Sequence, residues 1–148
     1  MGLPAVKFLS KGEENMKKIR LCIGSNDGEN IARTHMGDTE YFFIYDLLEN
    51  SENMFVEKRE NTARDMGHAK AEKMKEVLKI IKDADVLIAR QKSPNFINIA
   101  KKTKYQPVVV KIEKISDVIE LMDNSFQEIY TYVVRRKEGE IFDTIPEL

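Results

Sequence analysis

Apolar and polar positions along the chain follow two different periods, and these predict strands in the first part and a mixture of helices and strands later. In residues 19–24, apolar side chains alternate with polar or small ones, which is typical of a β-strand. Residues 41–45 are aromatic and apolar throughout, as in a strand that is buried on both faces. Turn formers at 50–53 follow, and residues 54–59 then predict a third strand, antiparallel to the second.

From residue 67 onward the period becomes helical. Ala71, Met74 and Ile81 fall on one face of an expected helix, with lysines and glutamates opposite. The elements expected in this part are a helix over 67–83, a strand over 85–89, a helix over 94–104, a strand over 107–112 and a last helix that Ser116 caps and whose apolar stripe runs to Val133.

This order of elements predicts the fold class. Short links favour an antiparallel meander among the first three strands, and intervening helices favour parallel, right-handed crossovers among the later ones. We therefore expect an α/β fold with a three-layer ribonuclease-H-like motif, in which a mixed five-stranded sheet carries helices on its faces. Residues 1–16 are expected to be a flexible extension, 17–137 the domain and 138–148 a polar tail.

Composition narrows the function classes. The 148 residues contain no apolar run long enough to cross a bilayer, and no secretory leader opens the chain, so we expect a cytoplasmic protein without membrane contact. The single cysteine, Cys22, excludes an internal disulfide and a cysteine-only zinc or iron–sulfur site. Because 24 Lys and Arg balance 25 Asp and Glu, a nucleic-acid partner is not expected.

Catalytic patterns are weak in this sequence. A two-metal nuclease of this fold class needs several converging carboxylates, and the first strand contains none, while Asp85 is better placed to end the preceding helical region. Cys22 lies within a strand, where a lone cysteine usually serves as a small buried hydrophobe. Nucleotide-binding glycine fingerprints and serine-hydrolase elbows are missing from the sequence. Binding is therefore favoured over catalysis.

A few residues remain as candidates for binding chemistry. His35 and His68 are possible metal contacts, although neither has a second histidine or cysteine at ligand spacing. The turn at 25–28 could offer backbone amides to an anion. The lysines at 101, 102 and 104 and the basic run 135–137 are interpreted as solvated helix ends, since cations are favoured there.

The order of several short motifs resembles one known family. These motifs are residues 18–28, His35-Met36-Gly37, 41–46, the charged strand 57–61 and the strand 83–89. Together they resemble the dinitrogenase iron–molybdenum cofactor biosynthesis family, whose members include NifX-like proteins, and the match covers about 17–120. The resemblance implies the ribonuclease-H-like fold and a carrier role for an iron–sulfur or iron–molybdenum cluster.

The resemblance also implies a site. His35 would contact the cluster, and Ser25, Asp27, Gly28 and Gly37 would shape the pocket around it. Two departures from the family pattern stand out. Met36 replaces the usual aromatic residue, and its soft thioether could line a cluster site. Residues 90–95 replace a glycine-rich loop, and Arg90 could instead pair with an anionic cluster.

The function expected from the sequence is therefore a small, non-enzymatic protein that binds a metal cluster transiently and exchanges it with cluster-assembly proteins, as a monomer or weak homodimer. The alternative is a metal-free regulatory or scaffold domain that binds a protein partner.

Overall fold

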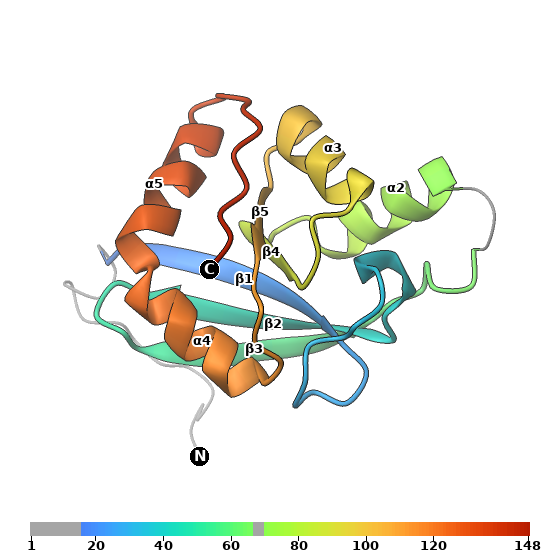
Figure 1. The fold of residues 1–148 in the computed structure, drawn as a ribbon, viewed down its shortest axis with the longest axis horizontal. Helices are drawn as coiled ribbons and strands as arrows, with labels where there is room; N and C mark the ends of the chain where they lie inside the picture. Colours follow the sequence, from blue (N-terminus) through green and yellow to red (C-terminus); the bar gives the residue numbers. More distant parts are fainter. Residues whose placement is uncertain (1–15, 67–69) are drawn as a thin grey trace, which may run out of the picture.

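The computed structural model describes residues 16–66 and 70–148, which form one five-stranded sheet with helices around it (Figure 1). The strands lie in the order β3-β2-β1-β4-β5. Their bounds are β1 Lys18–Ser25, β2 Tyr41–Leu48, β3 Asn53–Glu60, β4 Val86–Ala89 and β5 Gln106–Val109. β1, β2 and β3 pair antiparallel, and β4 pairs parallel with both β1 and β5. The predicted mixed sheet and α/β class are confirmed.

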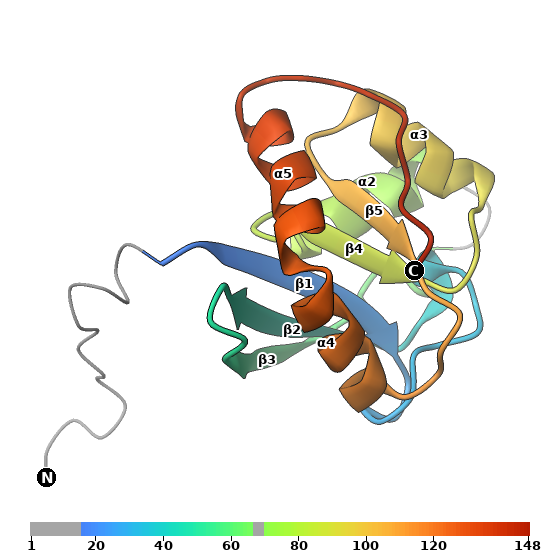
Figure 2. The same ribbon diagram turned by 60° about the vertical axis from the view of Figure 1, so that its left-hand side comes forward.

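The helices cover both faces of this sheet, and β1 shows why (Figure 2). Ile19, Leu21 and Ile23 are fully buried against helices α4 (Ile115–Asn124) and α5 (Phe126–Lys137) on one face. Cys22 points to the other face, where it joins the core beneath α2 (Lys70–Ile80) and α3 (Pro94–Lys102). The period-two alternation of a strand therefore supplies two cores at once. Cys22 is a buried hydrophobe, as predicted.

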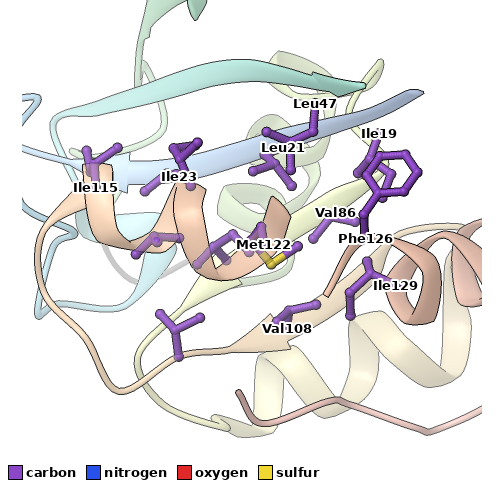
Figure 3. Packing of buried hydrophobic residues seen from close by; sticks show 14 of the residues in the cluster. Ile19, Leu21, Ile23, Leu47, Val86, Val108, Ile115, Met122, Phe126 and Ile129 are labelled. Carbon is purple, nitrogen blue, oxygen red and sulfur yellow. The ribbon is translucent and has the colours of Figure 1, made fainter. Parts of the chain in front are cut away.

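The last predicted helix is two helices, which corrects the sequence analysis. The chain leaves helical geometry at Ser125, whose N–H donates to the carbonyls of Leu121 and Met122. Serine is not among the strong helix formers, so a break here is physically reasonable, although its side chain makes no cap bond to α5. The apolar stripe nevertheless continues across the break, and Met122, on α4, and Phe126 point toward the same strands (Figure 3).

The predicted cap of that helix is also wrong. α4 begins at Ile115, with Lys114 in the capping position and no side-chain cap bond, so Ser116 lies inside the first turn. The entry to α4 is held by backbone contacts instead, because the Ile115 N–H donates to the Glu29 carbonyl at 2.9 Å.

Arg136 is the clearest error of the sequence analysis, which placed it on a solvated helix end. It is 3% exposed, and its guanidinium donates to the Gln106 side-chain oxygen at 2.7 Å and to the carbonyls of Ala100, Thr103 and Phe142 at 2.9, 3.1 and 3.1 Å. Burial lowers the pKa of Arg136 to about 10. The side chain thus joins α5 to α3, β5 and the C-terminal segment.

The C-terminal segment returns to the sheet. Ile145 and Pro146 are buried, the Val109 N–H donates to the Pro146 carbonyl, and the Leu148 N–H donates to the Val109 carbonyl, both at 2.9 Å. Residues 145–148 therefore run beside β5 and cover that edge of the sheet (Figure 1).

Candidate functional site

The segments that follow β1 and β4 meet at one edge of the sheet, since these strands are parallel and end side by side. The first segment leads through a short 3₁₀ turn, η1 (Met36–Asp38), and the second leads into α3. Ligands of open α/β sheets commonly bind outside the carboxyl ends of parallel strands. This edge is therefore the natural place for a site.

The turn directly after β1 is held by its own side chains. The Ser25 hydroxyl donates to the Asn30 carbonyl at 2.6 Å and accepts from the Gly28 N–H at 2.9 Å. The Asp27 carboxylate accepts from the N–H groups of Glu29 and Asn30 at 2.9 and 2.8 Å, and these bonds lower its pKa to about 2. The amides of residues 28–30 thus already have acceptors within the turn. Ser25 and Asp27 shape this loop through internal bonds.

His35 lies at the start of η1 and is exposed. The turn behind it is fixed by Asn61, a buried residue whose side-chain amide donates to the carbonyls of Gly37 and Thr39 at 3.0 and 2.8 Å. Asn61 also accepts from the Ala63 N–H at 3.0 Å. Asn61 directly follows β3, so these contacts fix the loop that contains His35 to the end of that strand.

A groove of about 450 Å³ opens between η1, α2 and the start of α3. Its lining residues are His35, Gly37, Asp38, Lys73, Met74, Val77, Ser93, Pro94 and Asn95. A pocket of about 30 Å³ shares His35, Gly37 and Met74 with this groove and adds Met36 and Arg90. We call the two hollows together the His35 groove. It offers an imidazole and the thioethers of Met36 and Met74.

The predicted site residues are thus divided by the structure. His35, Met36, Gly37 and Arg90 line the His35 groove, whereas Gly28 lines a cavity on the other face of the sheet. His68 lies outside the described residues. Met74 is the lining residue that the sequence analysis missed as a ligand candidate, since its place on the apolar face of a helix indicated only core packing.

Positive charge gathers beside the groove. Arg33 donates to Glu113 at 2.8 Å, and Arg90 lies 3.7 Å from the same carboxylate oxygen, so one acid serves two guanidinium groups. Arg33 lowers the pKa of Glu113. The first turn of α3 contains no acid, and the positive end of that helix faces the groove. The electrostatics here favour an anionic ligand.

The protein alone offers few strong metal ligands. Among residues 16–66 and 70–148, no group of three or more His, Cys, Asp or Glu side chains is arranged to hold a metal ion. Cys22 is shielded in the core, where burial raises the pKa of its thiol well above the ordinary value. Any cluster held in this groove would bring most of its own ligands.

Acids that might have formed a nuclease site are paired with arginines. Arg20 donates to Asp46 at 2.8 and 2.9 Å and to Asp83 at 2.7 Å, and Arg59 donates to Asp83 at 2.6 and 2.9 Å. These carboxylates form an ion-pair network at the other end of β1. Charge neutralisation of this kind does not suit paired magnesium ions.

The fold is that of a small ribonuclease-H-like α/β domain, and the His35 groove opens at the ends of its parallel strands. The family model of the dinitrogenase iron-molybdenum cofactor matches residues 17–125, and the chain belongs to that family. The suspected resemblance is thereby confirmed, and with it an association with cofactor biosynthesis or binding. No curated protein matches the chain. In the described part, no helix combines the length and apolar character needed to span a bilayer.

Proposed function

We propose that this protein is a non-enzymatic carrier that binds an iron–sulfur or iron–molybdenum cluster transiently in the His35 groove and exchanges it with cluster-assembly proteins. The observation that carries the proposal is the meeting of an exposed imidazole with two thioethers in one groove of a chain from this family. The cluster is cargo in this proposal.

The ligand chemistry supports a temporary site. Imidazole suits iron and other transition metals, and thioethers are soft ligands that tolerate metal–sulfur surfaces. A permanent cluster site uses several thiolates, and the buried Cys22 supplies none to the groove. One nitrogen ligand with polarisable neighbours is therefore consistent with a cargo that is later released.

The charge around the groove supports an anionic cargo. Arg33 and Arg90 share Glu113, so this acid already neutralises part of their charge. An anionic cluster in the groove would compete with Glu113 for Arg90, whose side chain is 27% exposed. Arg90 thus offers a charged side-chain contact at the point where the family resemblance implies a glycine-rich loop.

An anaerobic titration of the apo-protein with iron–molybdenum cofactor or a [4Fe–4S] cluster, read by visible absorption and gel filtration, tests the proposal. His35→Ala should weaken binding about tenfold or more, as expected for loss of a metal ligand or its support. Met74→Leu keeps the volume and removes the sulfur, so it should weaken binding by a smaller factor. Met54→Leu, at an exposed methionine on β3, is the matched control and should bind as the unaltered protein does.

A metal-free scaffold role is the second candidate, and one observation favours it. Phe55 and Met54 on the edge strand β3 are 53% and 46% exposed, which is unusual for large apolar side chains. Absence of cluster binding by the unaltered protein, together with a metal-independent complex that Phe55→Ser disrupts, would replace the carrier proposal with this one.

A further inference from the structure

A second cavity, larger than the His35 groove, lies on the opposite face of the sheet. Its volume is about 650 Å³, and it opens between α4, the face of β2 and the turn after β1. Figure 2 shows α4 running along this side of the sheet, away from α2 and α3. The lining residues are Gly28, Glu29, Asn30, Tyr45, Asn53, Lys114, Ile115, Ser116, Ile119, Glu120 and Asp123. We call this the α4 cavity.

Three apolar side chains belong to its lining. Ile115 and Ile119 project from α4, and the ring of Tyr45, half-buried on β2, packs against the same core. Phe55 stands beside Tyr45, with ring centroids 5.4 Å apart, and extends this aromatic surface outward. A volume in this range, with apolar side chains beside polar and charged ones, is compatible with a small organic ligand.

One end of the cavity is strongly electronegative. Asp123 and Glu120 are three residues apart on α4, so they lie on the same side of the helix. They lie in its last turns, where the helix dipole is negative, and the last turn contains no basic residue to offset it. A positive charge is therefore favoured at this end.

Asp123 also lacks a full set of partners. Oδ2 accepts from the Asn53 side-chain amide at 3.2 Å, whereas the buried Oδ1 has no hydrogen-bond donor among the described residues. Burial, followed by the charge of Glu120, raises the pKa of Asp123 despite the bond from Asn53. A carboxylate in this position would be stabilised by a cation placed beside it.

The remaining charges of the cavity lie at its other end. Lys114 directly precedes α4. Glu29 lies in the turn after β1, whose backbone pairs with the start of α4 through Asn30 and Lys114, so these two opposite charges lie near each other. The lining acids and bases are otherwise Glu120 and Asp123 alone. The combination of two acids with apolar side chains suits an organic cation, and among the described residues no group of three His, Cys, Asp or Glu is arranged for a metal ion.

We propose that the α4 cavity is a second ligand site, which binds a small organic cation with its ammonium group beside Asp123 and Glu120 and its apolar body against Ile115, Ile119 and Tyr45. This site is independent of the cluster proposal, since it shares no lining residue with the His35 groove. It gives the protein a means to sense or carry an amine on the face that the cluster does not use.

The test uses the full chain and three matched probes: phenethylammonium, the neutral 2-phenylethanol and the anionic 3-phenylpropanoate. Binding is followed by ¹H–¹⁵N correlation spectra. Phenethylammonium should shift the amides of Tyr45, Ile119 and Asp123 but not that of Met74, and it should bind about tenfold more tightly than the alcohol, as a charge-assisted hydrogen bond allows. The carboxylate probe should bind most weakly.

Asp123→Asn keeps the shape and removes the charge, so the preference for ammonium over alcohol should fall to about twofold or less. Asp117→Asn is the control, at an exposed acid of the same helix that does not line the cavity, and it should keep the preference. Equal affinity for the three probes, shifts centred on the His35 groove, or equal effects of the two substitutions would overturn the proposal. The probe comparison on the unaltered protein decides the question even if Asp123→Asn fails to fold.

Discussion

Replacing Arg136 with alanine is expected to destabilise the fold more than any other change of a charged side chain in α5. The guanidinium donates four hydrogen bonds of 2.7 to 3.1 Å, and all four acceptors belong to other elements of the structure. Two of the acceptors, the Ala100 and Thr103 carbonyls, lie at the C-terminal end of α3. The negative end of the helix dipole there also attracts a cation.

The magnitude follows from what the substitution removes and from what it leaves behind. Hydrogen bonds to charged groups contribute about 1.5–3 kcal/mol each, but burial of the guanidinium costs several kcal/mol, and its lowered pKa reflects that cost. Alanine also leaves buried acceptors without a donor, at about 1–3 kcal/mol for a group that water cannot reach. With water entering part of the space, we expect Arg136→Ala to lower the free energy of unfolding by about 3–5 kcal/mol.

The appropriate assay is urea unfolding followed by circular dichroism. The two proteins can be compared directly if the m-value is the same for both. Arg135→Ala is the matched control one position away, because Arg135 is 39% exposed and pairs only with Glu140 among the described carboxylates, at 3.3 Å. Its loss should cost less than about 1 kcal/mol. A cost for Arg136→Ala as small as that of the control would show that solvent can replace the guanidinium, and the account of a dry, satisfied site would be refuted.

Further predictions concern the turn, the ion-pair network and the cysteine. Gly28→Ala should cost about 2 kcal/mol and Gly139→Ala about 1 kcal/mol in urea unfolding, since φ is positive at both but only at Gly28 would the new Cβ meet a ring, at 3.0 Å; equal costs would contradict the packing argument. Asp83→Asn should cost about 1 kcal/mol at pH 7 after allowance for solvent screening, because Arg59 holds the pKa of this 38% exposed carboxyl below its ordinary value. That cost should be constant above about pH 5 and shrink as the pH falls further, because the unfolded chain takes up a proton first, and it should vanish once the native carboxylate is protonated as well; a cost that persists at low pH would exclude this origin. Cys22 should resist a thiol reagent at pH 8 until the protein is unfolded in urea, and rapid labelling of the native protein would contradict its burial.

The strands could be predicted from the sequence because their periods are local. Alternation in β1 and the aromatic run in β2 each specify which faces are buried, and the lengths of the links specify the pairing. The break between α4 and α5 escaped prediction because the apolar stripe stays in phase across Ser125, so periodicity alone could not reveal the change of direction.

The residues that line the His35 groove could be predicted only in part, for a different reason. His35 and Met36 are candidates from the sequence because they are adjacent in a recognisable motif, and both line the groove. Met74 reaches the same groove from α2, and nothing in its local pattern distinguishes a groove-lining methionine from a core one. Arg136 shows the same limit, since its acceptors come from four separate positions and only the tertiary fold brings them together. Contacts between distant segments carry no local sequence signal.

The C-terminal segment beside β5 has a consequence for self-association. Residues 145–148 cover one margin of the sheet, and among the described residues β3 forms the other margin. The backbone of β5 at Val109 is thereby already paired, so β3 is, within the described residues, the more open edge to which a strand of another molecule can add. Two molecules joined through their β3 strands would each present a covered β5 edge outward, which disfavours further edge-to-edge growth into a fibre.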